Sequence, residues 1–432
     1  MNYAETLSPE TRKRARIYAY FACVFGCVSE IMLDSSAVII IFLTMLGGSD
    51  MLTMLCAGFS GVSGALLYIP SGVLIACIGA KRMVKYSCLT GCAGFIIMAL
   101  APLAGEWGKY VATAGCFIYC IQRNSYGAAW YVLLDVFLRP EDRAGFFGMM
   151  RFIYTGVVGL LLFFIGVWMK TNPPIIFLQI VIAVTGLLVM GRYYCASKFP
   201  DNLRDAPEIP DIRKGLGISM KNGPLTAYSV YVGLLTVAYT SQIPLTYLYL
   251  KQYVNMNPGT VQIISSVGIA GSLVGYFCYS RFLGNFKLKY LELLTHLLYM
   301  AVAFTLFFLD KSVPGFAVWV GMAVFCNLLA FSIYMCNNSA EMLALARPGN
   351  KTMAIAFVNT YISGGNTVGR IGTSLILGTA MLAPVWEFGG RIISRYQTFF
   401  LISGVMLVIL LFLLPTLPSF IPSHDDYYEP KK

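Results

Sequence analysis

The chain has 432 residues, of which 58% are hydrophobic and only 12% are charged, whereas a soluble domain has roughly 25% charged residues. Its mean hydropathy is +0.71, and apolar stretches of about 20 residues, long enough to cross a bilayer as a helix, recur along the whole length. The composition excludes a sizeable soluble domain and predicts an integral membrane protein.

The apolar stretches predict an all-α protein with twelve transmembrane helices. The first six spans are expected near residues 17–46, 52–78, 84–104, 109–138, 148–169 and 175–195. The second six are expected near residues 224–250, 258–281, 288–309, 315–344, 353–383 and 397–420. Pro244 predicts a kink in the seventh span, because proline removes a helical hydrogen bond.

The basic residues indicate the orientation of these spans. Lys and Arg gather in the even-numbered connections and at both termini, as at Arg12, Lys81 and Arg139, so the positive-inside rule predicts that both termini are cytoplasmic. The net charge of +11 is therefore a signal of topology rather than a nucleic-acid patch. The polar start, with no small-residue cleavage site after the first apolar run, does not resemble a signal peptide. We expect a multi-pass plasma-membrane protein, in a bacterial inner membrane.

A polar stretch at residues 196–223 divides the chain into a six-helix bundle at 1–195 and a second bundle with a cytoplasmic tail at 224–432. The two halves match at corresponding loops. LRPEDR after the fourth span and ARPGNK after the tenth both read Arg-Pro-x-x-basic, and GAKRMVKY after the second span is similar to GNFKLKY after the eighth. Parallel six-helix repeats of this kind are typical of one large class of secondary transporters.

The twelve-span plan, the central loop and a short signature together resemble the major facilitator superfamily, over essentially the whole chain. That family has a motif after its second helix, roughly Gly-x-Leu-x-Asp-Arg-x-Gly-Arg-Lys, and here the stretch is GVLIACIGAKR at 72–82. Both glycines, Leu74 and the basic end are kept, whereas the acidic and first basic positions are Ala76 and Cys77. The departure indicates a divergent branch without the charge that the family's acidic residue supplies to the inner gate.

The resemblance also implies a gate on the cytoplasmic side. Acidic residues near the ends of the fourth and tenth spans precede an Arg, as in sugar-carrying members of the family, although solvated helix ends explain the same residues almost as well. The candidate gate residues are Gly72, Gly79, Lys81, Arg82, Asp135, Arg143, Glu341 and Arg347.

Four charged residues are predicted near the middle of their spans. Glu30 and Asp34 lie in the first span, Arg123 in the fourth and Arg370 in the eleventh. A charge at the bilayer centre costs roughly 2.5 to 3.5 kcal/mol on insertion scales, so such residues face a partner or a water-filled cavity. In the family fold the first and fourth helices line the central cavity and the eleventh flanks it, so the four residues are expected to share one polar site.

Other polar residues lie at similar depth. Asn359, Ser363, Asn366 and Arg370 are spaced four, three and four apart, which places them along one helical face. For the uncharged residues taken singly, hydrogen bonds between helices remain the alternative interpretation. The candidate substrate-binding residues are Arg123, Arg370, Gln122, Asn124, Asn359, Asn366, Tyr239, Gln242 and Asn327.

Two interpretations of the charged set stay open. In the first, Glu30 or Asp34 forms a buried ion pair with Arg123 that only fixes helix packing. In the second, one of the two acids is a proton-coupling residue, which takes up a proton when substrate diverts its Arg123 partner while Arg370 faces the substrate. We expect the second, because one ion pair leaves an acid and Arg370 without a role.

The expected function is secondary active transport of a small polar organic solute, sugar-like or carboxylate-like, by proton-coupled symport. A proton-coupled efflux antiporter is the alternative, and a non-transporting sensor or a lipid-modifying protein is the alternative from another class. The chain has only two His and no phosphate-binding loop or Cys/His metal spacing, so we expect no enzyme, no metal and no cofactor beyond a coupling proton or sodium ion. The expected partners are the solute and membrane lipids, with a monomeric chain and no nucleic acid.

Overall fold

The computed structural model describes residues 6–139, 142–169, 173–200, 212–282, 288–346, 350–379 and 381–416. The N-terminal half contains α2 (Pro9–Asp34), α3 (Val38–Met45), α4 (Asp50–Ile78), α5 (Ala80–Leu100), η1 (Ala101–Trp107), α6 (Gly108–Asp135), α7 (Arg143–Met169) and α8 (Ile175–Ser197). After α9 (Ile212–Met220), the C-terminal half contains α10 (Gly223–Tyr239), α11 (Gln242–Gln252), α12 (Pro258–Arg281), α13 (Leu288–Phe308), α14 (Phe316–Leu345), α15 (Lys351–Gly378), the strands β1 (Val385–Phe388) and β2 (Arg391–Ser394), α16 (Arg395–Leu413) and η4 (Leu414–Thr416).

The predicted spans are confirmed in number and order. By length and composition, nine helical segments of the described residues can cross a membrane, and one of them, 80–134, joins the third and fourth spans. The two other expected spans fall short for identifiable reasons. The seventh is divided into α10 and α11, with 17 and 11 residues, and the eleventh, α15, carries the polar stripe that ends in Arg370.

The first predicted span is interrupted, which corrects the expectation of one helix over 17–46. α2 ends at Asp34 and α3 begins at Val38, and the intervening Ser-Ser sequence provides hydroxyls that compete for backbone hydrogen bonds. The open backbone groups are satisfied locally and by the other half of the chain. The Ser36 hydroxyl accepts from the Val38 N–H, and Gln262 Oε1 on α12 accepts from the Ala37 N–H at 3.1 Å.

The seventh span has the predicted kink, seen as an interruption at Thr240 and Ser241, just before Pro244. Pro244 is the third residue of α11, so the N–H that proline lacks is the one that would have reached back across the interruption to the Thr240 carbonyl. The interruptions of the first and seventh spans occupy corresponding places in the two halves. Broken helices at matching positions mark the binding site in many transporter folds.

A two-stranded antiparallel hairpin, β1–β2, lies in the connection between the eleventh and twelfth spans. The eleventh span was expected to continue to residue 383, but α15 ends at Gly378. Gly389 and Gly390 close the hairpin with φ of 58° and 75°, a conformation that glycine adopts without strain. The Gly-Gly pair between VWEF and RIIS is a hairpin signal in the sequence that a span assignment based on hydropathy overlooks.

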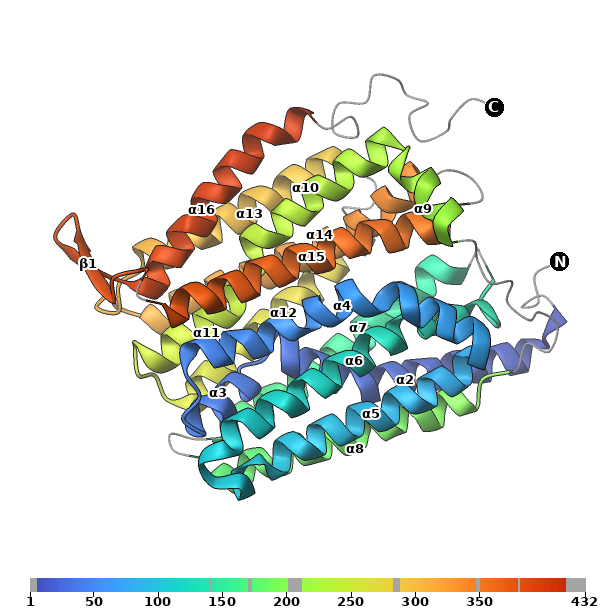
Figure 1. Cartoon of the computed structure of the whole chain (residues 1–432), viewed down its shortest axis with the longest axis horizontal. Helices are drawn as coiled ribbons and strands as arrows, with labels where there is room; N and C mark the ends of the chain where they lie inside the picture. Colours follow the sequence, from blue (N-terminus) through green and yellow to red (C-terminus); the bar gives the residue numbers. More distant parts are fainter. Residues whose placement is uncertain are drawn as a thin grey trace.

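The two halves lie side by side, with α4 against α15 and α7 against α12 (Figure 1). We call the end of the bundle that carries β1–β2 the hairpin end, and the opposite end, where α2 begins and α16 ends, the terminus end. α9 packs against the C-terminal half near the terminus end, where Asn350 donates hydrogen bonds to the Gly215 carbonyl and the Ser219 hydroxyl. The expected loop at 196–223 therefore contains a helix.

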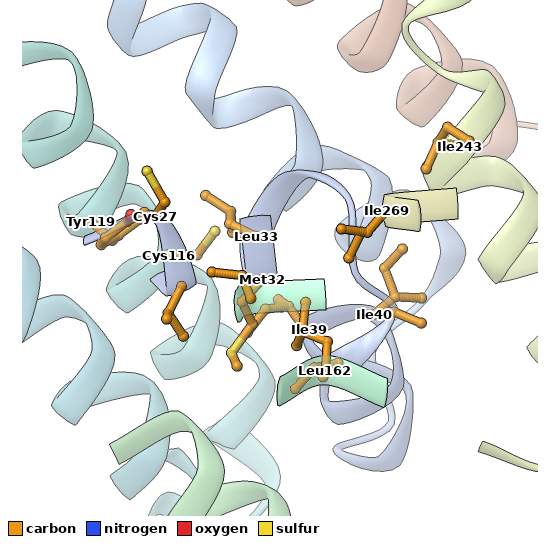
Figure 2. Packing of buried hydrophobic residues seen from close by; sticks show 14 of the residues in the cluster. Cys27, Met32, Leu33, Ile39, Ile40, Cys116, Tyr119, Leu162, Ile243 and Ile269 are labelled. Atoms are coloured by element: carbon orange, nitrogen blue, oxygen red, sulfur yellow. The ribbon is translucent and has the colours of Figure 1, made fainter. Parts of the chain in front are cut away.

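The buried apolar side chains show where the halves are joined. One cluster runs from the N-terminal half into the hairpin-end part of the C-terminal half, and Figure 2 shows its packing around the α2–α3 interruption, with Leu162 of α7 and Ile269 of α12 close to Ile39 and Ile40. The terminus-end part of the C-terminal half has a separate cluster among the described residues. The halves thus share a core at the hairpin end and have separate cores toward the terminus end.

Candidate functional site

Asp34 is the centre of the charged set. Its carboxylate forms an ion pair with Arg123 of α6, and one of its oxygens lies 3.6 Å from Nη1 of Arg370 on α15. The side chains of Asp34 and Arg123 are 21% and 29% exposed, although they lie between helices deep in the bundle. One carboxylate therefore contacts a guanidinium from each half of the protein and remains accessible to water.

The position of Asp34 explains why it needs two cations. It is the last residue of α2, where the helix dipole presents its negative end and disfavours a carboxylate. No basic residue occupies the last turn of that helix. Arg123 and Arg370 supply from neighbouring helices the positive charge that α2 itself lacks.

Arg370 is held by backbone carbonyls as well as by charge. Its Nε donates to the carbonyl and hydroxyl of Thr240, at 3.3 and 3.2 Å, and Nη1 donates to the Ala57 carbonyl of α4 at 2.6 Å. The Thr240 carbonyl is available because its usual helical partner would be the N–H of residue 244, and that residue is Pro244. The kink of the seventh span thus creates an acceptor for Arg370.

Glu30 has a different partner, which the sequence did not reveal. It forms an ion pair with Arg192 of α8 at 2.5 Å, and the Arg192 side chain is only 1% exposed. The guanidinium stacks 3.8 Å from the centre of the Tyr126 ring and donates through Nε to the Ala22 carbonyl. It lies directly over Gly26, where an added Cβ would be 1.6 Å from Arg192 Nε. All these groups belong to the N-terminal half.

The polar stripe of α15 faces the same region as Arg370. Asn366 accepts a hydrogen bond from the Thr240 hydroxyl through its Oδ1, while Asn359 makes no side-chain hydrogen bond with the described residues. Both are partly exposed. Tyr239, the last residue of α10, stacks on Tyr299 with ring centres 4.2 Å apart.

The other candidate binding residues mostly contact protein. Asn124 donates to the Ser60 carbonyl and the Ser63 hydroxyl, and Gln122 is buried against Gly91 of α5. Asn327 donates to Gln242, which in turn donates to Ser403, all inside the C-terminal half. These contacts favour the alternative of hydrogen bonds between helices for Asn124, Gln242 and Asn327.

The candidate gate residues at the terminus end are only partly described. Lys81 donates to the Phe199 carbonyl at 2.6 Å within the N-terminal half, and Arg82 is exposed. Gly79 joins α4 to α5 with φ of 85°, which accounts for the second glycine of the signature. Glu341 is buried. Arg347, the surroundings of Gly72 and the side chains of Asp135 and Arg143 lie outside the described part of the structure.

A second buried polar set, which the sequence reading missed, lies between α13 and α14. Glu292 is 5% exposed and accepts a hydrogen bond from Asn337 at 2.7 Å. His296 is fully buried and bonded at both ring nitrogens, to the Leu407 carbonyl and the Tyr231 hydroxyl. Because a carbonyl only accepts, His296 Nε2 carries the proton of that bond, and the two contacts hold the ring between α10, α13 and α16.

Polar contacts close the hairpin end between the two halves. Asp50 at the start of α4 pairs with Arg395 and accepts from the Tyr396 hydroxyl, both at the start of α16. Ser374 donates to the Met51 carbonyl at 2.6 Å, and the Tyr247 hydroxyl donates to the Ser35 carbonyl at 3.0 Å. With the shared apolar core, these bonds hold the hairpin end shut in this conformation.

No protein-family model and no curated protein matches the chain in sequence. Its fold is nevertheless similar to solved transporters. A variant of the nucleoside transporter NupG aligns with a TM-score of 0.70 at 14% identity, covering 94% of this chain and 99% of that one. A D-xylose-proton symporter aligns with 0.63 at 12% identity, covering 94% and 98%. A bacterial homologue of the iron transporter ferroportin in an inward-facing state aligns with 0.65 at 10% identity, covering 98% and 100%.

These proteins share the twelve-helix arrangement over nearly the full length of the chain. With the apolar helices, the similarity makes this a multi-pass membrane protein. The chain has the fold of the major facilitator superfamily.

Proposed function

We propose that the protein is a secondary transporter that carries a small polar organic solute through the membrane by alternating access, coupled to a proton through Asp34. One observation carries the proposal: a water-accessible carboxylate at the end of an interrupted helix is shared between Arg123 of one half and Arg370 of the other. The solved transporters of this fold include a xylose-proton symporter, which supports proton-driven symport. The termini are then cytoplasmic, and the hairpin end, which the shared core and the polar contacts hold shut, faces the opposite side of the membrane.

The arrangement of contacts supports Asp34 rather than Glu30 as the coupling acid. The Glu30 pair with Arg192 lies within one half, so a relative movement of the halves leaves it intact. Arg370, in contrast, keeps Thr240 in its own half but contacts Asp34 and Ala57 across the interface. When the halves separate at the hairpin end, Asp34 loses one of its two cations. Its charge state then depends on the conformation, as coupling requires.

The test is uptake into proteoliposomes under an imposed pH gradient. With one proton per solute, a gradient of one pH unit drives accumulation of about 10-fold. Asp34→Asn is expected to abolish uphill accumulation while downhill exchange of labelled solute continues. Uphill uptake that survives this substitution removes Asp34 from the mechanism.

Glu30→Gln is the matched comparison, because it removes the other acid of the first span. We expect it to lower stability more than coupling, so its uphill accumulation persists where folded protein is obtained. A sodium gradient in place of the proton gradient distinguishes the coupling ion, and accumulation under the reversed gradient indicates export. If no gradient and no solute produces measurable flux, a sensor or lipid-modifying role is favoured.

A further inference from the structure

The charges around Asp34 do not cancel. Glu30 forms an ion pair with Arg192, and the charges of this pair cancel. Asp34 offers one negative charge to both Arg123 and Arg370. Arg123 and Arg370 also repel each other electrostatically. Among the described side chains of this set, one positive charge is left without a counter-charge in the middle of the bundle.

Arg123 is the cation with free donors. A guanidinium has five N–H donors in a planar fork that matches a carboxylate, and Asp34 is the only ion-pair or hydrogen-bond partner of Arg123 among the described residues. Arg370, in contrast, donates its Nε and Nη1 hydrogens to backbone carbonyls, and its side chain is only 9% exposed. The open side of Arg123, 29% exposed, is therefore the place where an anion can form new hydrogen bonds.

Uncharged polar side chains lie along α15 on the same helical face as Arg370, and one of them shares Thr240 with it. Asn366 uses only its Oδ1, for the Thr240 hydroxyl, so its two N–H donors have no partner among the described residues. Asn359 lies seven residues earlier on the same face of α15, and both side chains are partly exposed. Amides in this position suit hydroxyl groups of a solute whose charged end lies on Arg123.

We propose that the site takes a singly charged organic anion with a hydroxylated body, its carboxylate on Arg123 and its hydroxyl groups toward Asn359 and Asn366. The inference rests on the proposed transport function and narrows its substrate class. A neutral sugar would leave the positive charge uncompensated in a region where charge is costly, a doubly charged anion would overcompensate it, and a cation would be repelled.

The first experiment uses matched pairs of solutes that differ in charge. Purified full-length protein is titrated with D-gluconate or sorbitol, D-glycerate or glycerol, and L-lactate or 1,2-propanediol, and the melting temperature is followed. At least one anion is expected to raise the melting temperature at a concentration at least 10-fold below that of its neutral counterpart. Equal effects within every pair, or no effect of any anion, overturn the proposal.

Substitutions test whether the anion binds at this site. Arg123→Gln removes a charge-assisted contact and is expected to weaken anion binding about 10- to 100-fold, whereas Lys13→Gln, an equal charge change at an exposed position, leaves it unchanged. Asn366→Asp keeps Arg123 and cancels the excess charge, so it is expected to reduce the preference for the anion at least 10-fold. Anion binding that is unaffected by both Arg123→Gln and Asn366→Asp overturns the proposal.

Flux measurements separate this inference from the proposed function. Anion binding without any flux in proteoliposomes supports the substrate class and counts against transport. Uptake of sorbitol or glycerol that gluconate and glycerate do not inhibit supports transport and overturns the substrate class.

Discussion

Gly26→Ala tests the Glu30–Arg192 pair through a single methyl group. The added Cβ would be 1.6 Å from Arg192 Nε and 1.7 Å from its Cζ, whereas non-bonded heavy atoms need about 3.5 Å, so the guanidinium must move by about 2 Å. That displacement breaks the 2.5 Å contact with Glu30. Breaking a buried ion pair costs about 3 to 5 kcal/mol, and since Glu30 is 23% exposed, we expect a loss near 3 kcal/mol in the free energy of unfolding.

The assay is unfolding of purified protein in mixed micelles with increasing denaturing detergent. Gly156→Ala is the control, because a Cβ at Gly156 on α7 meets no atom within 4 Å, and a change within about 1 kcal/mol is expected there. In an Arg192→Ala background, Gly26→Ala should cost much less than alone, because the atoms that clash are gone. A Gly26→Ala variant as stable as Gly156→Ala would refute the reasoning.

Two further predictions concern the interface between the halves. Asp50→Asn removes the charge that Arg395 pairs with at the hairpin end. A partly exposed pair of this kind is worth about 1 kcal/mol, so amide hydrogen exchange at the start of α16, followed by mass spectrometry, should become roughly 5-fold faster. An unchanged exchange rate contradicts a closing role for Asp50. Gly61→Ala puts a Cβ 2.7 Å from the Thr367 backbone nitrogen and should lower the free energy of unfolding by about 1 to 3 kcal/mol; stability equal to that of Gly156→Ala would show that α4 and α15 separate without cost.

The sequence predicted the parts of the fold that depend on local composition. The lengths of the apolar runs located the spans. Asp34 and Arg123 lie near the middle of their spans, and this depth predicted that each has a partner on another helix. These inferences succeed because a bilayer imposes the same length and polarity on every helix. The division of the first span was missed, because Ser35, Ser36 and Ala37 are compatible with a continuous apolar run unless the contact from Gln262 is known.

Arg192 shows what sequence reasoning cannot supply. It lies near the end of its predicted span, where basic residues are common at the cytoplasmic boundary, so the sequence does not single it out. Its burial depends on the absence of a side chain at Gly26, on Glu30 one turn further along α2, and on the ring of Tyr126. Together with Arg192 on α8, these groups come from three helices, and a single sequence does not say which helices touch. The same limit hid the pairing of Gln242 with Asn327.

Pro244 and Arg370 are 126 positions apart, yet Arg370 depends on the carbonyl that the kink at Pro244 leaves open. Any other residue at position 244 would restore an N–H that competes with Arg370 for the Thr240 carbonyl. An Arg at position 370 without the kink would lose that acceptor and carry a poorly satisfied buried charge. The two positions are therefore expected to vary together during evolution. Relatives that lose the proline should also lose the arginine, and with it the cation that the C-terminal half contributes to the site.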